Sequence, residues 1–214
     1  MNSKLDSFSQ AELDRADAKS RKRKAARDKM LAQKTLEKGL LIVHTGKGKG
    51  KSTAAFGLVF RALGNDMRVG IIQFVKGKWE TGERFALDKF ENQVEIQAMG
   101  EGFSWDTQDK ARDIKAAEAA WDRAEQWIEL CRGENPKFDM ILLDELNIPL
   151  RYNNLPISRI LRTLKNKPSN LHIIITGRNA KDELIEAADL VTEMGQIKHP
   201  FREQNVKAQR GIEF

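Results

Sequence analysis

The sequence predicts an α/β fold, a three-layer sandwich whose central sheet is mostly parallel. From Gly39 onward, short apolar runs alternate with longer stretches of helical character. The runs are continuous rather than alternating, which is typical of strands covered on both faces. A glycine-rich basic segment follows the first run directly. Alternation of this kind favours parallel strands joined by helical crossovers, with ligands at the carboxyl ends of the strands.

Six apolar runs have the length and composition of strands. Five are rich in Ile, Leu or Val, and the sixth is weaker. In chain order the expected strands cover residues 40–44, 69–74, 94–98, 140–144, 171–176 and 190–193.

Helical stretches fall between most of these runs. The longest contains Trp121 and Trp127, which we interpret as packing residues. The expected helices cover residues 51–63, 83–90, 107–130, 157–164 and 180–187.

Residues 1–38 differ from the domain predicted for residues 39–214. They are polar, contain no Gly or Pro, and include the dense basic block of residues 19–24. Such a segment can form a helix but has too few apolar residues to build a core. We expect a mobile or lid-like arm that orders over an anionic ligand. An arm that binds nucleic acid is the alternative.

Composition narrows the setting of the protein. The chain has 214 residues and a formal net charge of +6, which favours anionic partners of any kind. Its only cysteine, Cys131, has no second cysteine with which to form an internal disulfide, so we expect a reducing cytoplasm. We see no signal-peptide pattern and no run near the roughly 20 apolar residues of a membrane span.

The segment after the first expected strand has the form of a phosphate-binding loop. Its glycines let backbone N–H groups turn toward an anion, and the helix behind it adds the positive end of its dipole. Lys51 would reach the outer phosphates, and the hydroxyl of Ser52 or Thr53 would bind Mg²⁺. The predicted nucleotide-binding residues are Gly46, Lys47, Gly48, Lys49, Gly50, Lys51, Ser52 and Thr53.

The loop departs from the common pattern, which has a glycine where this chain has Thr45; the first glycine comes one place later. A basic surface loop without function is the alternative, but the strand before and the helix after disfavour it. We therefore predict a P-loop, RecA-like nucleotide-binding fold.

Two carboxylates, Asp144 and Glu145, end the expected strand at residues 140–144. In nucleotide-binding sheets an acid at this point holds Mg²⁺, directly or through water. Alone the pattern is weak, since many parallel strands end in Asp. Together with the phosphate loop it predicts a magnesium site formed by Ser52, Asp144 and Glu145. Either acid could be the inner ligand.

Several blocks of the sequence together resemble the bacterial ATP:corrinoid adenosyltransferases, which make adenosylcobalamin. The resemblance covers most of residues 39–214. The matching blocks are residues 45–57, 73–79 with Gly82 and Glu83, 102–107, 143–146, 176–178 and 206–212. Two positions depart from the family's usual loop: Lys47 replaces an Asn, and Ser52 replaces a Thr while keeping the hydroxyl.

The resemblance implies an unusual reaction for a P-loop. The Co(I) of a reduced corrinoid attacks the 5′ carbon of ATP, and inorganic triphosphate leaves. The loop, Lys51, Glu145 and Mg²⁺, or Mn²⁺ in its place, would stabilise charge on the departing triphosphate. The loop cations Lys76 and Arg178 are further candidates for phosphate contact.

The resemblance also implies a role for Phe103 and Trp105. In this family an aromatic pair here excludes the lower ligand of Co(II), which eases reduction by a flavoprotein reductase. From the residues alone, a hydrophobic staple for the following helix is the better interpretation. We further expect a homodimer.

Two other functions compete with adenosyl transfer. A RecA-like ATPase could hold nucleic acid through its basic arm, with Glu145 polarising water, but no RNA-binding signature or recognition helix supports it. A small-molecule kinase is the third possibility. The products distinguish them: triphosphate, ADP with phosphate, or ADP with a phosphorylated substrate.

Overall fold

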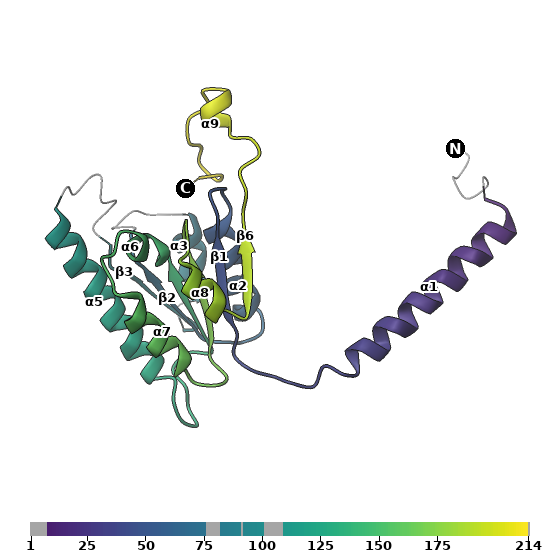
Figure 1. Cartoon of the computed structure of the whole chain (residues 1–214), viewed down its shortest axis with the longest axis horizontal. Coiled ribbons are helices and arrows are strands. Elements are labelled where there is room, and N and C mark those ends of the chain that lie inside the picture. Colours follow the sequence, from purple (N-terminus) through teal and green to yellow (C-terminus); the bar gives the residue numbers. More distant parts are fainter. Residues whose placement is uncertain (1–7, 76–81, 91, 101–108, 214) are drawn as a thin grey trace. The chain divides into compact units, whose positions relative to one another are not determined.

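The computed structural model describes residues 8–75, 82–90, 92–100 and 109–213 (Figure 1). The chain divides into two compact units, residues 1–37 and 38–214, which are described separately. In the described residues, no helix is both long enough and apolar enough to cross a membrane.

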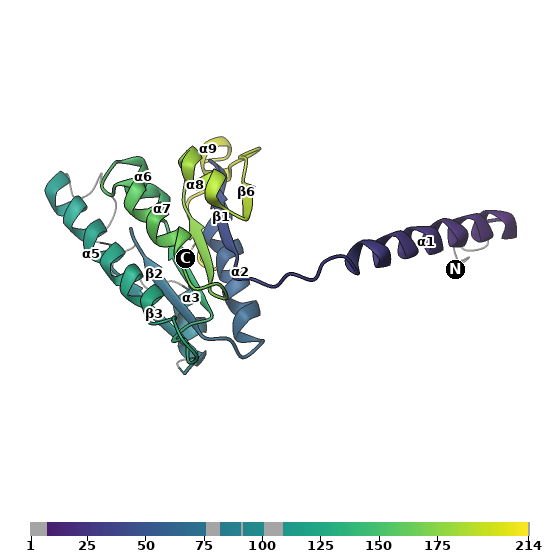
Figure 2. The same cartoon turned by 60° about the horizontal axis from the view of Figure 1, so that its bottom comes forward.

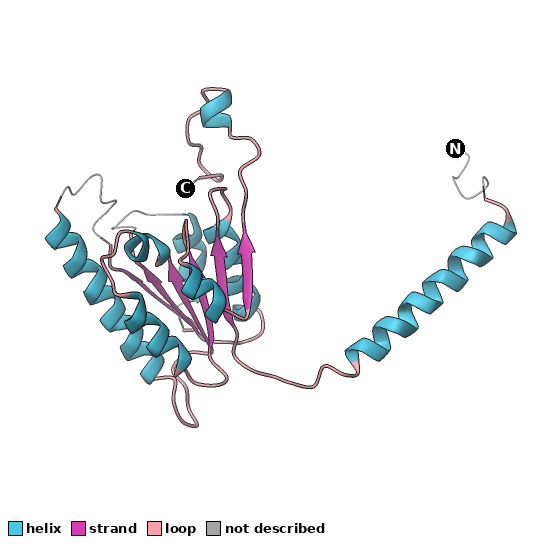
Figure 3. Ribbon diagram, viewed as in Figure 1, coloured by secondary structure: helices cyan, strands magenta, loops and turns pink. Residues whose placement is uncertain are grey.

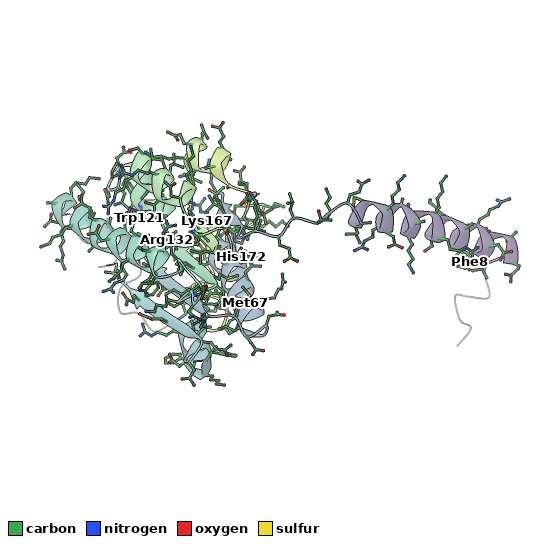
Figure 4. The ribbon with its side chains drawn as sticks, turned by 90° about the horizontal axis from the view of Figure 1, so that it is seen from below. Phe8, Met67, Trp121, Arg132, Lys167 and His172 are labelled. Atoms are coloured by element: carbon green, nitrogen blue, oxygen red, sulfur yellow. The ribbon has the colours of Figure 1, made fainter. Side chains whose placement is uncertain are left out.

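The first unit holds one helix, α1 (Gln10–Leu31). The helix begins with a capping box. The Ser9 hydroxyl accepts a hydrogen bond from the backbone N–H of Glu12, and the Glu12 carboxylate accepts one from the backbone N–H of Ser9 at 2.8 Å. Side chains project all around this helix, and none is buried (Figure 4). Local hydrogen bonds, rather than a core, therefore hold α1.

The second unit is built on one six-stranded sheet in which every pairing is parallel (Figure 3). The strand order is β3-β2-β4-β5-β1-β6. The strands are β1 (Leu41–Thr45), β2 (Val69–Gln73), β3 (Val94–Ala98), β4 (Met140–Asp144), β5 (His172–Thr176) and β6 (Leu190–Glu193). All six expected strands are confirmed. The central four are buried, whereas the edge strands β3 and β6 are only partly covered.

Helices cover both faces of the sheet and form the outer layers (Figures 1 and 2). The helices of this unit are α2 (Lys51–Leu63), α3 (Gly82–Leu87), α5 (Lys110–Glu129), α6 (Asn147–Arg151), α7 (Ile157–Lys165), α8 (Asp182–Ala187) and α9 (Pro200–Glu203), with a 3₁₀ turn η2 (Asp88–Phe90). The short helices α6 and α9 were not expected, because one turn leaves almost no periodic pattern in a sequence.

Two apolar clusters join the layers. One packs α2 and α3 on Ile42, Ile71 and Leu142. The other packs α5 to α8 on the opposite side chains of the same strands. Trp121 and Trp127 are buried in the second cluster, which confirms their interpretation as packing residues.

The strand order places the functional segments at one edge of the sheet. β5 lies between β1 and β4, so the loops after these three strands are neighbours. The phosphate loop follows β1, and the acidic pair lies at the end of β4. The strand β5 lies between these two strands, an order that the sequence did not predict and that is typical of the RecA-like fold expected for the chain.

Candidate nucleotide site

The phosphate loop joins β1 to α2 and depends on glycine at three positions. Gly46 and Gly50 have φ of 96° and 98°, in the left-handed region that favours glycine. Gly50 is also the N-cap of α2 and has no side chain with which to cap it. The N–H groups of the first helical turn are therefore left for an anion.

The third glycine, Gly48, is required by a close approach of the chain that follows β6. A Cβ at Gly48 would lie 2.7 Å from the carbonyl oxygens of both Met194 and Gly195. The N–H of Gly48 donates to Met194 O at 2.7 Å, and the N–H of Met194 donates to Thr45 O at 2.9 Å. The backbone after β6 thus supports the phosphate loop from one side.

Two lysines of the loop have acceptors inside the protein. Lys51 is 6% exposed, and its Nζ donates to the carbonyl of Gly48. Burial is the main reason that the pKa of Lys51 lies below its usual value; Arg178 adds to the lowering and Glu145 opposes it. Lys49 forms an ion pair with Glu213, near the end of the chain. Its pKa is lowered by burial and then by Arg178.

The remaining loop residues differ in exposure. Lys47 and Thr53 are exposed, whereas Ser52 is half-buried. Ser52 is the member of the hydroxyl pair that faces the acidic strand, because its Oγ donates to Asp144 Oδ1 at 2.7 Å.

Asp144 is fully buried at the centre of the site. Besides Ser52, it accepts from Thr176 Oγ1 at 2.8 Å and from Gln73 Nε2 at 3.3 Å. Buried among three donors, the Asp144 side chain has a defined orientation toward the start of α2.

Glu145 is held differently. It is half-buried, and its φ of 63° is unusual for a residue other than glycine. Its N–H donates to Thr176 Oγ1 at 2.8 Å. Its charge raises the pKa of Lys51, against the effect of burial, and its Oε2 lies beside Gly177, 3.1 Å from where a Cβ of that residue would be.

Arg178 lies just beyond β5 and is exposed. Its charge acts on both Lys49 and Lys51. The structure therefore brings Arg178 to the phosphate loop, as its position after a strand suggested. Phe103, Trp105 and Lys76 lie outside the described residues.

Sequence reasoning missed several residues of this site. Thr176 and Gln73 end the strands on either side of β4 and bond to Asp144. A polar residue at the end of an apolar run was the available signal. Nothing in the sequence indicates that Met194 and Glu213 contact the loop, because both residues lie far from it along the chain.

This fold and site define a P-loop nucleotide-binding protein. The family described as "ATP:corrinoid adenosyltransferase BtuR/CobO/CobP" matches residues 37–214. The chain belongs to this family, which confirms the resemblance found in the sequence.

Individual relatives agree over nearly the whole chain. A corrinoid adenosyltransferase from Sinorhizobium sp is 53% identical, over 92% of this chain and 90% of its own. Those from Pseudomonas aeruginosa and Escherichia coli K12 are 47% and 41% identical, over 90% and 87% of this chain and 92% and 91% of theirs.

Proposed function

We propose that this protein transfers the 5′-deoxyadenosyl group of ATP to the Co(I) of a reduced corrinoid. An electron pair of Co(I) forms the new bond between cobalt and C5′. The bond from C5′ to the phosphate oxygen breaks, and inorganic triphosphate leaves with the electron pair of that broken bond. The observation that carries the proposal is a phosphate loop backed by two acids, in a chain whose relatives at 41–53% identity are corrinoid adenosyltransferases.

The phosphate loop supplies the positive charge that the reaction needs. Charge develops on the departing triphosphate, and preorganised donors at that point lower the barrier. We assign this role to backbone N–H groups of the phosphate loop and the first turn of α2, apart from that of Gly48, which donates to Met194 O, and to the side chains of Lys51 and Arg178. Lys51 would exchange its bond to Gly48 O for a phosphate oxygen. No general base is needed, because the nucleophile is the metal of the substrate.

The residues present fit a magnesium ion. Ser52 Oγ and Asp144 Oδ1 lie 2.7 Å apart, and Glu145 adds a carboxylate at the same strand end. Hard oxygen ligands of this kind suit Mg²⁺ or Mn²⁺, and Mg²⁺ usually completes its shell with water and substrate phosphates. Within the described residues there is no group of three His, Cys, Asp or Glu side chains that could hold a metal ion. When bound, the ion would neutralise charge on the triphosphate.

Other parts of the proposal rest on the family resemblance. Phe103 and Trp105 would keep the lower ligand away from Co(II), so that a flavoprotein reductase delivers the electron. In that case Phe103→Ala and Trp105→Ala should lose activity with a flavoprotein donor and keep most of it with chemically generated Co(I). Equal losses with both reductants would leave the pair as packing residues.

We also propose a homodimer and a cytoplasmic location. The free, buried thiol of Cys131 fits a reducing compartment. Sedimentation of the purified protein tests the dimer, and a monomer at micromolar concentration would exclude it. Fractionation of cells tests the location.

Product analysis tests the reaction itself. The protein is incubated with ATP, Mg²⁺ and chemically reduced corrinoid, and the phosphate products are separated. We expect triphosphate in equal amount to the alkylated corrinoid. ADP with phosphate would support the nucleic-acid-dependent ATPase, and ADP with a phosphorylated acceptor would support a kinase.

A further inference from the structure

We propose that Thr176 is a positioning residue that holds Asp144 and Glu145 as one unit facing the magnesium-bound triphosphate. The inference rests on the proposed function, because it concerns the metal that ATP would bring. Thr176 is the last residue of β5, the strand between the phosphate-loop strand and the acidic strand. It is fully buried, yet its hydroxyl faces the functional edge of the sheet.

One hydroxyl links both acids. Thr176 Oγ1 accepts the backbone N–H of Glu145 at 2.8 Å and lies 2.8 Å from Asp144 Oδ1. Because an ionised carboxylate can only accept, the hydroxyl proton points to Asp144. The result is a chain from the Glu145 amide through the hydroxyl to the Asp144 carboxylate, in which each bond strengthens the other.

Glu145 needs this support because of its backbone. A Glu in the left-handed region is uncommon, and such a conformation persists only where the surroundings determine it. The bond from its N–H to Thr176 is one such constraint.

The residue after Thr176 adds a second constraint. Gly177 has a φ of 126°, and a Cβ there would lie 2.9 Å from Asn147 Cβ and 3.1 Å from Glu145 Oε2. Asn147 is buried and donates from Nδ2 to Gly177 O at 3.0 Å. The residues that follow β5 are therefore packed tightly against the residues that follow β4, which restricts the position of Glu145.

The geometry separates positioning from direct binding. The hydroxyl of Thr176 bonds to the backbone N–H of Glu145 and to the carboxylate of Asp144, and both partners belong to the acidic pair. Its loss should therefore leave the phosphate-loop contacts of ATP in place and disturb the carboxylates. The expected defect is in the use of Mg²⁺, with little change in metal-free nucleotide binding.

The test compares Thr176→Val, which keeps the shape and removes the hydroxyl, with Thr176→Ser, which keeps the hydroxyl. Thr163→Val is the matched control, because Thr163 Oγ1 also donates to a carboxylate, Glu125 Oε1 at 2.7 Å, on helices away from the site. Thr176→Ala replaces the valine variant if that variant does not fold. The measurements are ATP affinity in EDTA, ATP affinity in Mg²⁺, the Mg²⁺ concentration for half-maximal turnover, and the melting temperature.

For Thr176→Val we expect ATP affinity in EDTA within about twofold of wild type, and a rise of about tenfold or more in half-saturating Mg²⁺. Thr176→Ser should restore the Mg²⁺ dependence to within about threefold, and Thr163→Val should change the melting temperature alone. A Thr176→Val protein that loses stability but keeps the wild-type Mg²⁺ dependence overturns the inference. If the wild-type protein releases no triphosphate, the proposed reaction fails, and the affinities for ATP with and without Mg²⁺ still decide the role of Thr176.

Discussion

At the residue scale, Lys51 is a buried cation whose Nζ donates to a backbone carbonyl, that of Gly48. A buried ammonium is costly unless it is paired. Glu145 already offsets part of this cost electrostatically, and a bound triphosphate would add a further negative partner, so more of the burial cost is recovered in the complex. This explains why a side chain that is unfavourable in the ligand-free protein is favourable for function.

Replacing Lys51 by Ala should reduce turnover by roughly 10²–10³-fold, because a preorganised charge on the leaving group is lost. ATP affinity should also fall, while the melting temperature should stay the same or rise as a buried charge is removed. Turnover by product analysis and ATP binding by calorimetry check this. Near wild-type turnover would exclude the role given to the phosphate loop.

His172 gives the stability of the domain a dependence on pH. Its Nδ1 accepts a hydrogen bond from the backbone N–H of Leu40 at 3.2 Å, so Nδ1 carries no proton. Figure 4 labels it together with Lys167 at the amino-end side of the sheet. Burial and the charge of Lys167 lower the pKa of His172, whereas Asp139 opposes them. In the unfolded chain this His has a pKa of about 6.5.

Because the folded pKa lies below the unfolded one, the unfolded chain binds the proton more readily. The stabilisation that comes from the neutral His172 ring is fully present above a pH of about 6.5. It is lost as the pH falls from there through the folded pKa of His172. The Leu40 bond itself contributes about 0.5–1.5 kcal/mol. His172→Gln keeps an acceptor without a titrating group, so it should flatten the fall in melting temperature between pH 8 and 5.5. An identical pH profile in both proteins would contradict this assignment.

At the element scale, the phosphate loop is supported by the chain that leaves β6. The loop and this segment are far apart in sequence and are joined by backbone hydrogen bonds. Gly48 permits that approach, since backbone atoms of both Met194 and Gly195 occupy the space of a Cβ. The loop therefore depends on an edge strand as well as on its own glycines.

Gly48→Ala should displace the loop and destabilise the domain by roughly 1–3 kcal/mol. ATP affinity should fall on the order of tenfold or more, because small displacements of binding groups are costly. The control is Gly57→Ala in α2, where no heavy atom lies within 4 Å of the new Cβ. That change should stabilise the helix by about 0.5–1 kcal/mol. Melting curves measure the stability of both variants, and titrations measure their affinity for ATP. Unaltered ATP binding in Gly48→Ala would contradict the role given to the segment after β6 in supporting the phosphate loop.

At the scale of the whole molecule, the chain combines a domain with its own core and a helix without one. No side chain is buried among the described residues 8–37, and the described apolar core is built from Leu41 onward. We propose that this arm orders over bound corrinoid and ATP, because a site that handles reactive Co(I) should exclude water.

Deletion of residues 1–37 should leave the melting temperature almost unchanged, weaken corrinoid binding several-fold, and change ATP affinity less. Titrations with corrinoid and ATP, each in the presence of the other, measure the difference. Tight RNA binding that disappears on deletion and weakens steeply with salt would instead support a nucleic-acid arm. A variant in which the Lys and Arg residues of positions 19–24 are replaced by Gln keeps the length of the arm and removes its charge. Comparing it with the deletion shows which of the two properties binding needs.

The sequence by itself determined the sheet, the phosphate loop, the acidic pair and the family. These features are local: apolar runs of strand length, glycines at fixed offsets before a Lys and a Ser, and two acids at a strand end. The strands and the phosphate loop can each be recognised in a short window, because the physical requirement acts on neighbouring residues, whereas the acidic pair and the family needed several such windows in combination.

Only the tertiary structure decided which residues complete the site. Thr176 meets Asp144 because β5 is inserted beside β4, and Met194 supports Gly48 because β6 pairs with β1. It also decided the different settings of the two acids, with Asp144 buried among hydrogen-bond donors and Glu145 half-buried in a left-handed turn. Such contacts depend on strand order, which joins residues far apart in the chain and leaves no pattern in any short window.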